Sequence, residues 1–195
     1  EVLVEKTLYN NVGLARAVDG QTVLVDNAIS GDRVLCQVTT KHSHYQQAKI
    51  IETIEKNPRR KESSCRFFPK CGGCQWQDVK YSEQVGFKKS FIQDALTRIA
   101  KLPVSEDQIE IWQGEDDYYR NRVLFRCEIK NDQTIGVGFF EEGSHTQIHV
   151  SHCKIASLGI NELLAEFSKA RFDLPPQKFR MEWQTLPYYE ERELA

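Results

Sequence analysis

The stretch Cys65-Arg66-Phe67-Phe68-Pro69-Lys70-Cys71-Gly72-Gly73-Cys74 places three cysteines within ten residues. Gly72 and Gly73 let the backbone turn tightly enough for the thiols of Cys71 and Cys74 to face one centre. A fourth cysteine, Cys153, lies far downstream. Thiolates are the soft ligands that iron–sulfur clusters and zinc prefer. Three neighbouring cysteines plus one distant cysteine therefore predict an iron–sulfur cluster or a structural zinc site.

The spacing favours a cluster but leaves zinc open. Structural zinc usually binds two short cysteine pairs, whereas the partner of the triple here is a single cysteine. His149 and His152 lie beside Cys153, so a zinc site of three cysteines and one histidine remains an alternative. Cys36 and Cys127 fall on the apolar faces of expected strands, and we interpret both as core residues.

The composition is that of an ordinary soluble protein. The 195 residues are 40% hydrophobic and 28% charged, with a net charge of −2. No apolar run approaches the ~20 residues that a membrane helix requires, and no secretory pattern opens the chain. We therefore expect a cytoplasmic protein without a membrane partner, whose cysteines bind metal or lie in the core instead of forming disulfides.

The hydrophobic pattern predicts an α+β protein with two domains. Residues 2–57 contain short alternating runs between turn signals, which indicates a small β-barrel. Residues 81–101 and 158–171 show helical spacing, and strands are expected between and after them. We expect a β-barrel domain over residues 1–57 and a central α/β domain over residues 58–195, with antiparallel strands and the cysteine loop.

Positive charge is concentrated between Lys41 and Lys70, where eight lysines and arginines stand against three glutamates. Such a patch beside a metal loop favours a polyanionic partner such as nucleic acid. The residue types that pair with phosphates or stack on bases define the candidate RNA contacts, which are Lys41, Arg59, Arg60, Lys61, Trp76, Arg120 and Arg122. The alternatives are a solvated linker for residues 59–61, core packing for Trp76, and solvated side chains for the last two arginines.

Four motifs together resemble one known family. They are Cys65-x5-Cys71-Gly72-Gly73-Cys74-Gln75-x-Gln77, then Tyr119-Arg120-Asn121-Arg122, then Val137-Gly138-Phe139-Phe140-Glu141-Glu142-Gly143-Ser144, then Val150-x2-Cys153. This set resembles the RNA uracil-5-methyltransferases, and most nearly the branch that acts on 23S ribosomal RNA. Residues 12–16 and 28–34 also resemble segments of the TRAM domain, an OB-like RNA-binding barrel.

The resemblance implies a cofactor, its ligands and a partner. It implies a [4Fe-4S] cluster held by Cys65, Cys71, Cys74 and Cys153, and it favours this cluster over the zinc site more strongly than the spacing does. It also implies ribosomal RNA as the partner, with no role in binding DNA. We further expect the chain to be a monomer.

The resemblance does not extend to the catalytic part of the family. Its members continue into a Rossmann-like domain, which binds S-adenosylmethionine and carries the nucleophilic cysteine and the acidic base. None of these has a counterpart among the 195 residues. We therefore expect the RNA-binding and cluster-binding portion of such an enzyme, without catalysis by these residues alone. The alternative is a free-standing RNA-binding module stabilised by an iron–sulfur or zinc site.

Overall fold

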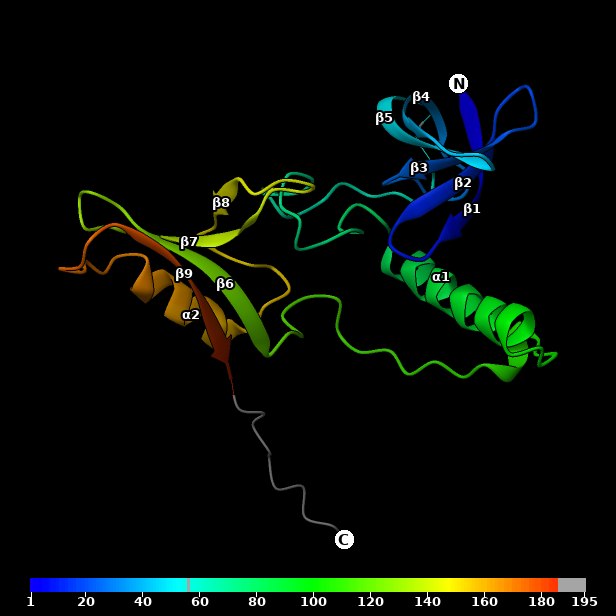
Figure 1. Ribbon diagram of the computed structural model, residues 1–195. Coiled ribbons are helices and arrows are strands. Elements are labelled where there is room, and N and C mark those ends of the chain that lie inside the picture. The colour runs from blue at the N-terminus through cyan, green and yellow to red at the C-terminus, as the bar shows by residue number, and fades with distance from the viewer. Residues whose placement is uncertain (56, 186–195) are drawn as a thin grey trace, which may run out of the picture. The chain divides into compact units, whose positions relative to one another are not determined.

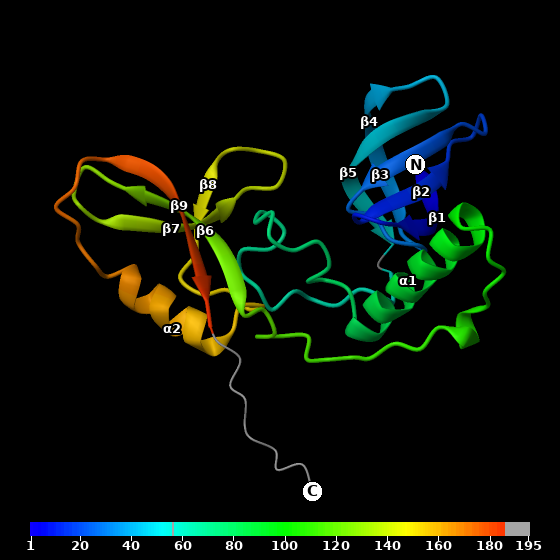
Figure 2. The same ribbon diagram turned by 60° about the horizontal axis from the view of Figure 1, so that its bottom comes forward.

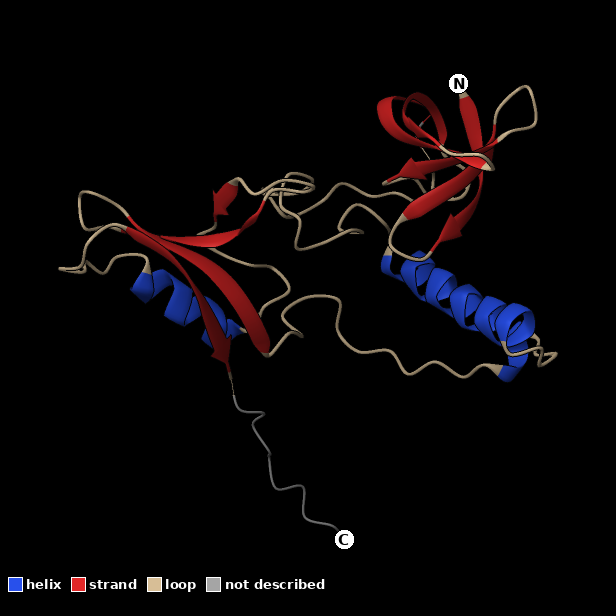
Figure 3. Ribbon diagram, viewed as in Figure 1, coloured by secondary structure: helices blue, strands red, loops and turns tan. Residues whose placement is uncertain are grey.

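The computed structural model describes residues 1–55 and 57–185, and it shows an α+β protein (Figures 1 and 3). The described chain divides into two compact units. Unit 1 comprises residues 1–64 and 75–113, and unit 2 comprises residues 65–74 and the described residues from 114 onward. The expected α+β class is confirmed. Within the described residues, no helix combines the length and apolarity that crossing a membrane would require.

Unit 1 contains a closed five-stranded β-barrel (Figures 1 and 2). Its strands are β1 (Val2–Leu8), β2 (Val12–Arg16), β3 (Thr22–Asp26), β4 (Arg33–Lys41) and β5 (Tyr45–Glu55). The order β1-β2-β3-β5-β4 closes where β4 pairs with β1. β3 and β5 run parallel, and the other neighbours are antiparallel. The barrel predicted from residues 2–57 is therefore confirmed.

Alternation along the strands builds the barrel core. In β3 the side chains of Val23 and Val25 are buried, whereas their neighbours are only half-buried, as expected for a strand with one face inward. The core also contains Val2, Val4, Ala15, Ala28, Val34 and Ala48. Cys36 packs against this core from β4, which agrees with its interpretation as a core residue.

Helix α1 (Tyr81–Asp94) belongs to unit 1 and continues as a π-helical turn over Ala95–Ile99. Phe87 is the buried residue of α1 and packs with Ile29 and Val79. A short 3-10 turn, Glu106–Gln108, follows. The helix predicted over residues 81–101 is therefore present, with its last turn widened.

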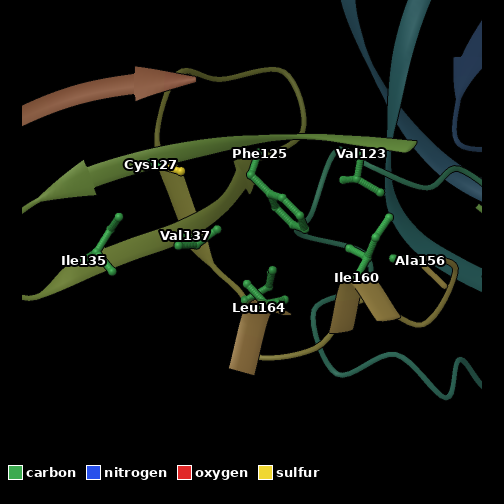
Figure 4. Packing of buried hydrophobic residues seen from close by; sticks show 9 residues of the cluster. Val123, Phe125, Cys127, Ile135, Val137, Ala156, Ile160 and Leu164 are labelled. Atoms are coloured by element: carbon green, nitrogen blue, oxygen red, sulfur yellow. The ribbon is translucent and has the colours of Figure 1, made fainter. Parts of the chain in front are cut away.

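Unit 2 is an antiparallel sheet covered by one helix. The sheet order is β8-β7-β6-β9, with β6 (Arg122–Ile129), β7 (Ile135–Phe140), β8 (Gln147–His149) and β9 (Gln177–Gln184). Helix α2 (Leu158–Phe167) begins after Ser157, whose hydroxyl accepts a hydrogen bond from the amide of Ile160. Ile160 and Leu164 of α2 face Val123, Phe125 and Val137 of the sheet (Figure 4). 

Cys127 also lies in this core, at 1% exposure (Figure 4). Burial raises the pKa of its thiol to about 11, so the thiol is neutral at physiological pH. Its interpretation as a core residue therefore agrees with the structure.

Two glycine substitutions test the packing. A methyl group on Gly138 would lie 1.8 Å from the carbonyl oxygen of Ile148, so Gly138→Ala must separate β7 from β8. We expect a loss of about 3 kcal/mol in the free energy of unfolding.

Gly86→Ala is the matched control, because nothing lies within 4 Å of the added methyl in α1. That change should stabilise α1 by about 0.5–1 kcal/mol. Urea unfolding followed by circular dichroism measures both, and equal effects would contradict this packing.

Candidate metal centre and nucleic-acid interface

The cysteine loop, residues 65–74, is anchored by backbone hydrogen bonds within unit 2. Inside the loop, the amide of Phe68 donates to the carbonyl of Cys65 at 3.1 Å. Cys71 forms a β-bridge with Glu141, and the amide of Gly72 donates to the carbonyl of Phe140 at 3.0 Å. The loop is therefore paired with the end of β7.

Cys153 is held by a polar side chain of α2. Its amide donates to Oδ1 of Asn161 at 2.7 Å, and Nδ2 of Asn161 donates back to its carbonyl at 3.0 Å. Asn161 is 8% exposed, so a buried amide fixes the backbone of the predicted ligand. Sequence reasoning missed Asn161, although an asparagine on the apolar face of a predicted helix was a signal that could have identified it.

The thiol of Cys71 is affected by other predicted ligands. Burial raises its pKa most strongly, and the nearby thiols of Cys153 and Cys65 raise it further, as does Glu142. A hydrogen bond from the amide of Gly73 opposes this rise. Cys71 is therefore close enough to two of the other predicted ligands for their charges to interact.

The thiol of Cys153 shows the same pattern. Burial is the largest cause of its raised pKa, and Cys65 adds to the rise. The amides of Ala156 and Ile155 and the guanidinium of Arg120 act in the opposite direction, because each favours a thiolate. Cys65 and Cys153 thus lie near Cys71, and Cys65 lies near Cys153. Cys74 lies in the same loop, two glycines after Cys71.

The all-thiol donor set suits one of the two predicted kinds of centre better than the other. In the described residues, no three or more cysteine, histidine or acidic side chains are arranged to hold a metal ion. The cysteines of this part of the chain form no disulfide. Ligands of one zinc ion would bring their sulfurs within about 4 Å of one another, because Zn–S bonds are ~2.3 Å long. A [4Fe-4S] cluster instead takes four thiolates on separate irons. The donor chemistry fits such a cluster, whose assignment remains a prediction.

The two histidines of the alternative zinc site have other neighbours. Nε2 of His149 lies 3.8 Å from a carboxylate oxygen of Glu128. Burial lowers the pKa of His149, assisted by Lys130 and opposed by Glu128. Nε2 of His152 lies 3.3 Å from the hydroxyl of Tyr118. These contacts give the three-cysteine, one-histidine alternative no support.

Arg60 is engaged inside unit 1. Its guanidinium donates to both carboxylate oxygens of Asp32, with Nη2–Oδ2 at 2.6 Å and Nε–Oδ1 at 3.1 Å, and it also pairs with Asp78. The side chains of Arg60 and Asp32 are 17% and 1% exposed. The carboxylate of Asp32 also accepts from the amide of Ile29 and from Nδ2 of Asn57. This internal ion pair, and not the predicted RNA contact, accounts for the position of the Arg60 side chain.

Trp76 is likewise used for packing. Its indole N–H donates to Oδ1 of Asn11, a buried side chain. Its ring centroid lies 5.7 Å from that of Phe87 and 6.0 Å from that of Phe91. The core-packing alternative therefore describes Trp76 better than a base-stacking role does.

The other predicted RNA contacts lie nearer the surface. Lys41, at the end of β4, and Lys61 are exposed, and Nε of Arg59 lies 3.2 Å from Oε2 of Glu83. In unit 2 the side chains of Arg120 and Arg122 are exposed. Arg122 pairs with Glu182 across the β6–β9 pair, and Arg120 lies beside the Cys153 segment, with its amide donating to the carbonyl of Ile155 at 2.8 Å.

Comparison with known proteins identifies relatives of this chain. An RNA methyltransferase of Clostridium acetobutylicum, described as uncharacterized, is 36% identical over 152 residues, which are 75% of this chain and 32% of that protein. The 23S rRNA (uracil(1939)-C(5))-methyltransferase RlmD of Haemophilus ducreyi is 28% identical over 156 residues, 80% of this chain and 34% of that protein. The chain thus spans about a third of the length of these curated relatives. No protein-family model matches.

A solved structure shares the fold. The Pyrococcus abyssi tRNA (uracil-54, C5)-methyltransferase, in complex with S-adenosyl-L-homocysteine, aligns with a TM-score of 0.56 at 21% identity. The alignment covers 86% of this chain and 36% of that one. The resemblance to RNA methyltransferases inferred from the sequence motifs is therefore confirmed: the chain is homologous to proteins of this class over most of its length.

The buried ion pair of unit 1 can be tested by removing one partner. Arg60→Ala leaves the carboxylate of Asp32 buried without its cation, which should cost about 3–5 kcal/mol of unfolding free energy. Lys41→Ala removes the same charge from an exposed position and should change it by less than about 0.5 kcal/mol. Chemical denaturation of the two variants and the parent measures the difference. If Arg60→Ala changed the free energy of unfolding as little as Lys41→Ala does, the ion pair would contribute little to stability.

Proposed function

We propose that this chain is the RNA-binding and cluster-binding portion of an S-adenosylmethionine-dependent methyltransferase that modifies C5 of uracil in 23S ribosomal RNA. The observation that carries the proposal is the similarity to RNA methyltransferases over most of the chain, with relatives named for uracil C5 of 23S rRNA among them. We assign neither the cofactor site nor the catalytic cysteine to these residues. We further propose that the enzyme is cytoplasmic and that the chain is monomeric.

We assign a [4Fe-4S] cluster to Cys65, Cys71, Cys74 and Cys153. The support is an all-thiol donor set within unit 2, the proximity of Cys65 to Cys71 and Cys153, and the fixing of Cys153 by Asn161. The cluster, when bound, supplies covalent links between loop 65–74 and the segment around Cys153. Methyl transfer to uracil requires no electron transfer, so we propose a structural role for the cluster.

We assign RNA binding to the barrel and to exposed basic residues of both units. Five-stranded barrels of the OB type bind oligonucleotides, and we propose that residues 1–57 form a TRAM-like barrel of this kind. Lys41, Arg59 and Lys61 supply positive charge in unit 1, and Arg120 and Arg122 supply it in unit 2. Such residues pair with phosphates without reading the sequence.

The cluster assignment predicts a coloured protein. Chain purified without oxygen should contain about four irons and absorb broadly near ~400 nm. Changing Cys65, Cys71, Cys74 or Cys153 to Ser should remove the absorption band, because each thiolate holds one iron. Cys36→Ser is the matched control and should keep it. Metal analysis with absorption spectroscopy measures both quantities. Stoichiometric zinc without iron would instead favour a zinc-stabilised RNA-binding module.

The RNA assignment predicts a salt-dependent affinity. Lys41→Ala combined with Lys61→Ala should reduce the slope of log affinity against log salt by about 1–2, since roughly 0.9 counterions are released for each phosphate neutralised on a duplex. The matched control is Lys169→Ala, which removes an exposed lysine next to α2. Filter binding to a 23S ribosomal RNA fragment at several salt concentrations measures the slope. An unchanged slope in the double variant would contradict the role of these two lysines.

The activity itself is tested with the protein expressed from its whole reading frame. That protein should transfer a labelled methyl group from S-adenosylmethionine to a uridine of 23S ribosomal RNA. Mass spectrometry of the digested RNA should then identify 5-methyluridine. Binding of RNA without any methyl transfer would favour the free-standing RNA-binding module instead.

A further inference from the structure

A cleft of about 480 Å³ lies in unit 2 beside the cysteine loop. One part of its wall is the backbone of Gly72 and Gly73, and another is the turn of residues 141–145. Arg126 of β6 and Phe140 at the end of β7 supply charged and aromatic surface. None of the residues that line this cleft is among the predicted metal ligands or RNA contacts.

The side chains of the cleft form a stacking platform. The guanidinium carbon of Arg126 lies 4.6 Å from the centre of the Phe140 ring, and the ring of His145 meets Phe140 edge-on at 5.5 Å. Arg126 pairs with Gly138 on β7, where no side chain competes for space. Nε2 of Gln147 donates to the carbonyl of Arg126 at 2.7 Å and ties its backbone to β8. Guanidinium planes and aromatic rings are the surfaces on which unpaired RNA bases stack.

The charges of the cleft distinguish among possible ligands. Glu141 and Glu142 line it together with Arg126, so acidic groups outnumber the arginine. This balance disfavours a phosphate, which the carboxylates would repel. A carboxylate instead accepts hydrogen bonds from amino groups such as N4 of cytosine. Uracil has a carbonyl oxygen at the same place, whose lone pairs would face those of the carboxylates.

The cysteine loop fixes one wall of the cleft. The amide of Glu142 donates to the carbonyl of Lys70 at 2.8 Å, in addition to the hydrogen bond from Gly72 to Phe140. A methyl group on Gly72 would lie 3.2 Å from the carbonyl oxygen of Phe140, a tight contact that the neighbouring backbone would have to relieve by a few tenths of an ångström. The loop that carries three of the predicted cluster ligands therefore also shapes this cleft.

We propose that the cleft binds an unpaired RNA base that carries an amino group on its Watson–Crick edge, as cytosine does, and that it discriminates against uracil. The base stacks on the platform of Arg126 and Phe140, and its amino group donates to Glu141 or Glu142. This inference rests on the proposed RNA-binding function and identifies a base-selective subsite within it. The subsite would hold a base other than the uracil that is modified.

The test compares labelled octamers of cytidine and of uridine. Both carry the same number of phosphates, so the salt-dependent part of binding is the same and the difference reports the base. Fluorescence anisotropy with the cluster-containing chain should show cytidine octamer bound about tenfold more tightly. Arg126→Lys keeps the charge but loses the planar guanidinium, and it should weaken binding of cytidine octamer about five- to tenfold.

Two further variants make the result specific. Arg180→Lys is the matched control, because Arg180 is paired with Arg126 across β6 and β9, is exposed, and does not line the cleft. It should leave both affinities unchanged. Glu141→Gln combined with Glu142→Gln should bring the ratio of the two affinities towards one, since an amide can also donate to the carbonyl of uracil. The absorption band of the cluster must be the same in all variants compared.

The outcomes separate this inference from the proposed function. Equal binding of the two octamers, or equal effects of Arg126→Lys and Arg180→Lys, would overturn the subsite while salt-dependent RNA binding stands. Failure of the unaltered chain to bind either octamer or a ribosomal RNA fragment would overturn both. Cytidine preference that depends on Arg126 and on the two glutamates would establish the subsite.

Discussion

The pairing of the cysteine loop with the end of β7 is the contact on which the candidate site of unit 2 depends. Residues 65–74 belong to unit 2, although the residues on both sides of them belong to unit 1. Backbone hydrogen bonds hold the loop there, so its place does not depend on the identity of most of its side chains. The thiols of Cys65 and Cys71 consequently lie near Cys153. The loop backbone at Gly72 and Gly73, held by the same hydrogen bonds, forms a wall of the cleft.

A different constraint organises the basic run that follows the barrel. Asp32 is almost completely buried, and a buried carboxylate is costly unless it is paired and fully hydrogen-bonded. Arg60 supplies the paired charge, while the amide of Ile29 and Nδ2 of Asn57 supply further hydrogen bonds. Arg60, one arginine of a run that resembles a solvated patch, is therefore held by an ion pair inside unit 1, whereas Arg59 pairs with Glu83 and Lys61 is exposed.

Patterns of local origin predicted much of the fold. The period-two runs in residues 2–57 and 122–140 indicated strands because alternate side chains of a half-buried strand face the core. The helix expected over residues 158–171 was recognisable from its own local spacing, and α2 occupies Leu158–Phe167 of that range. The widened last turn of α1 and the hydrogen bonds between Asn161 and Cys153, eight residues apart, were not predicted, since residue type and spacing alone do not indicate them.

The sequence by itself determined the all-thiol donor set, the strand and helix pattern, and the resemblance to RNA methyltransferases, because these are properties of residue type and spacing. Only the tertiary structure decided which side chains of each type are exposed. Arg60 and Trp76 have the chemistry of RNA contacts, but their contacts with Asp32 and Phe87 make them part of the packing of unit 1. Phe140 and Glu142 contribute to the sequence only as part of a family motif, but strand pairing and the cysteine loop gather them with Arg126 around one cleft. Charge and stacking act over a few ångströms, and only folding brings residues distant in sequence within that range.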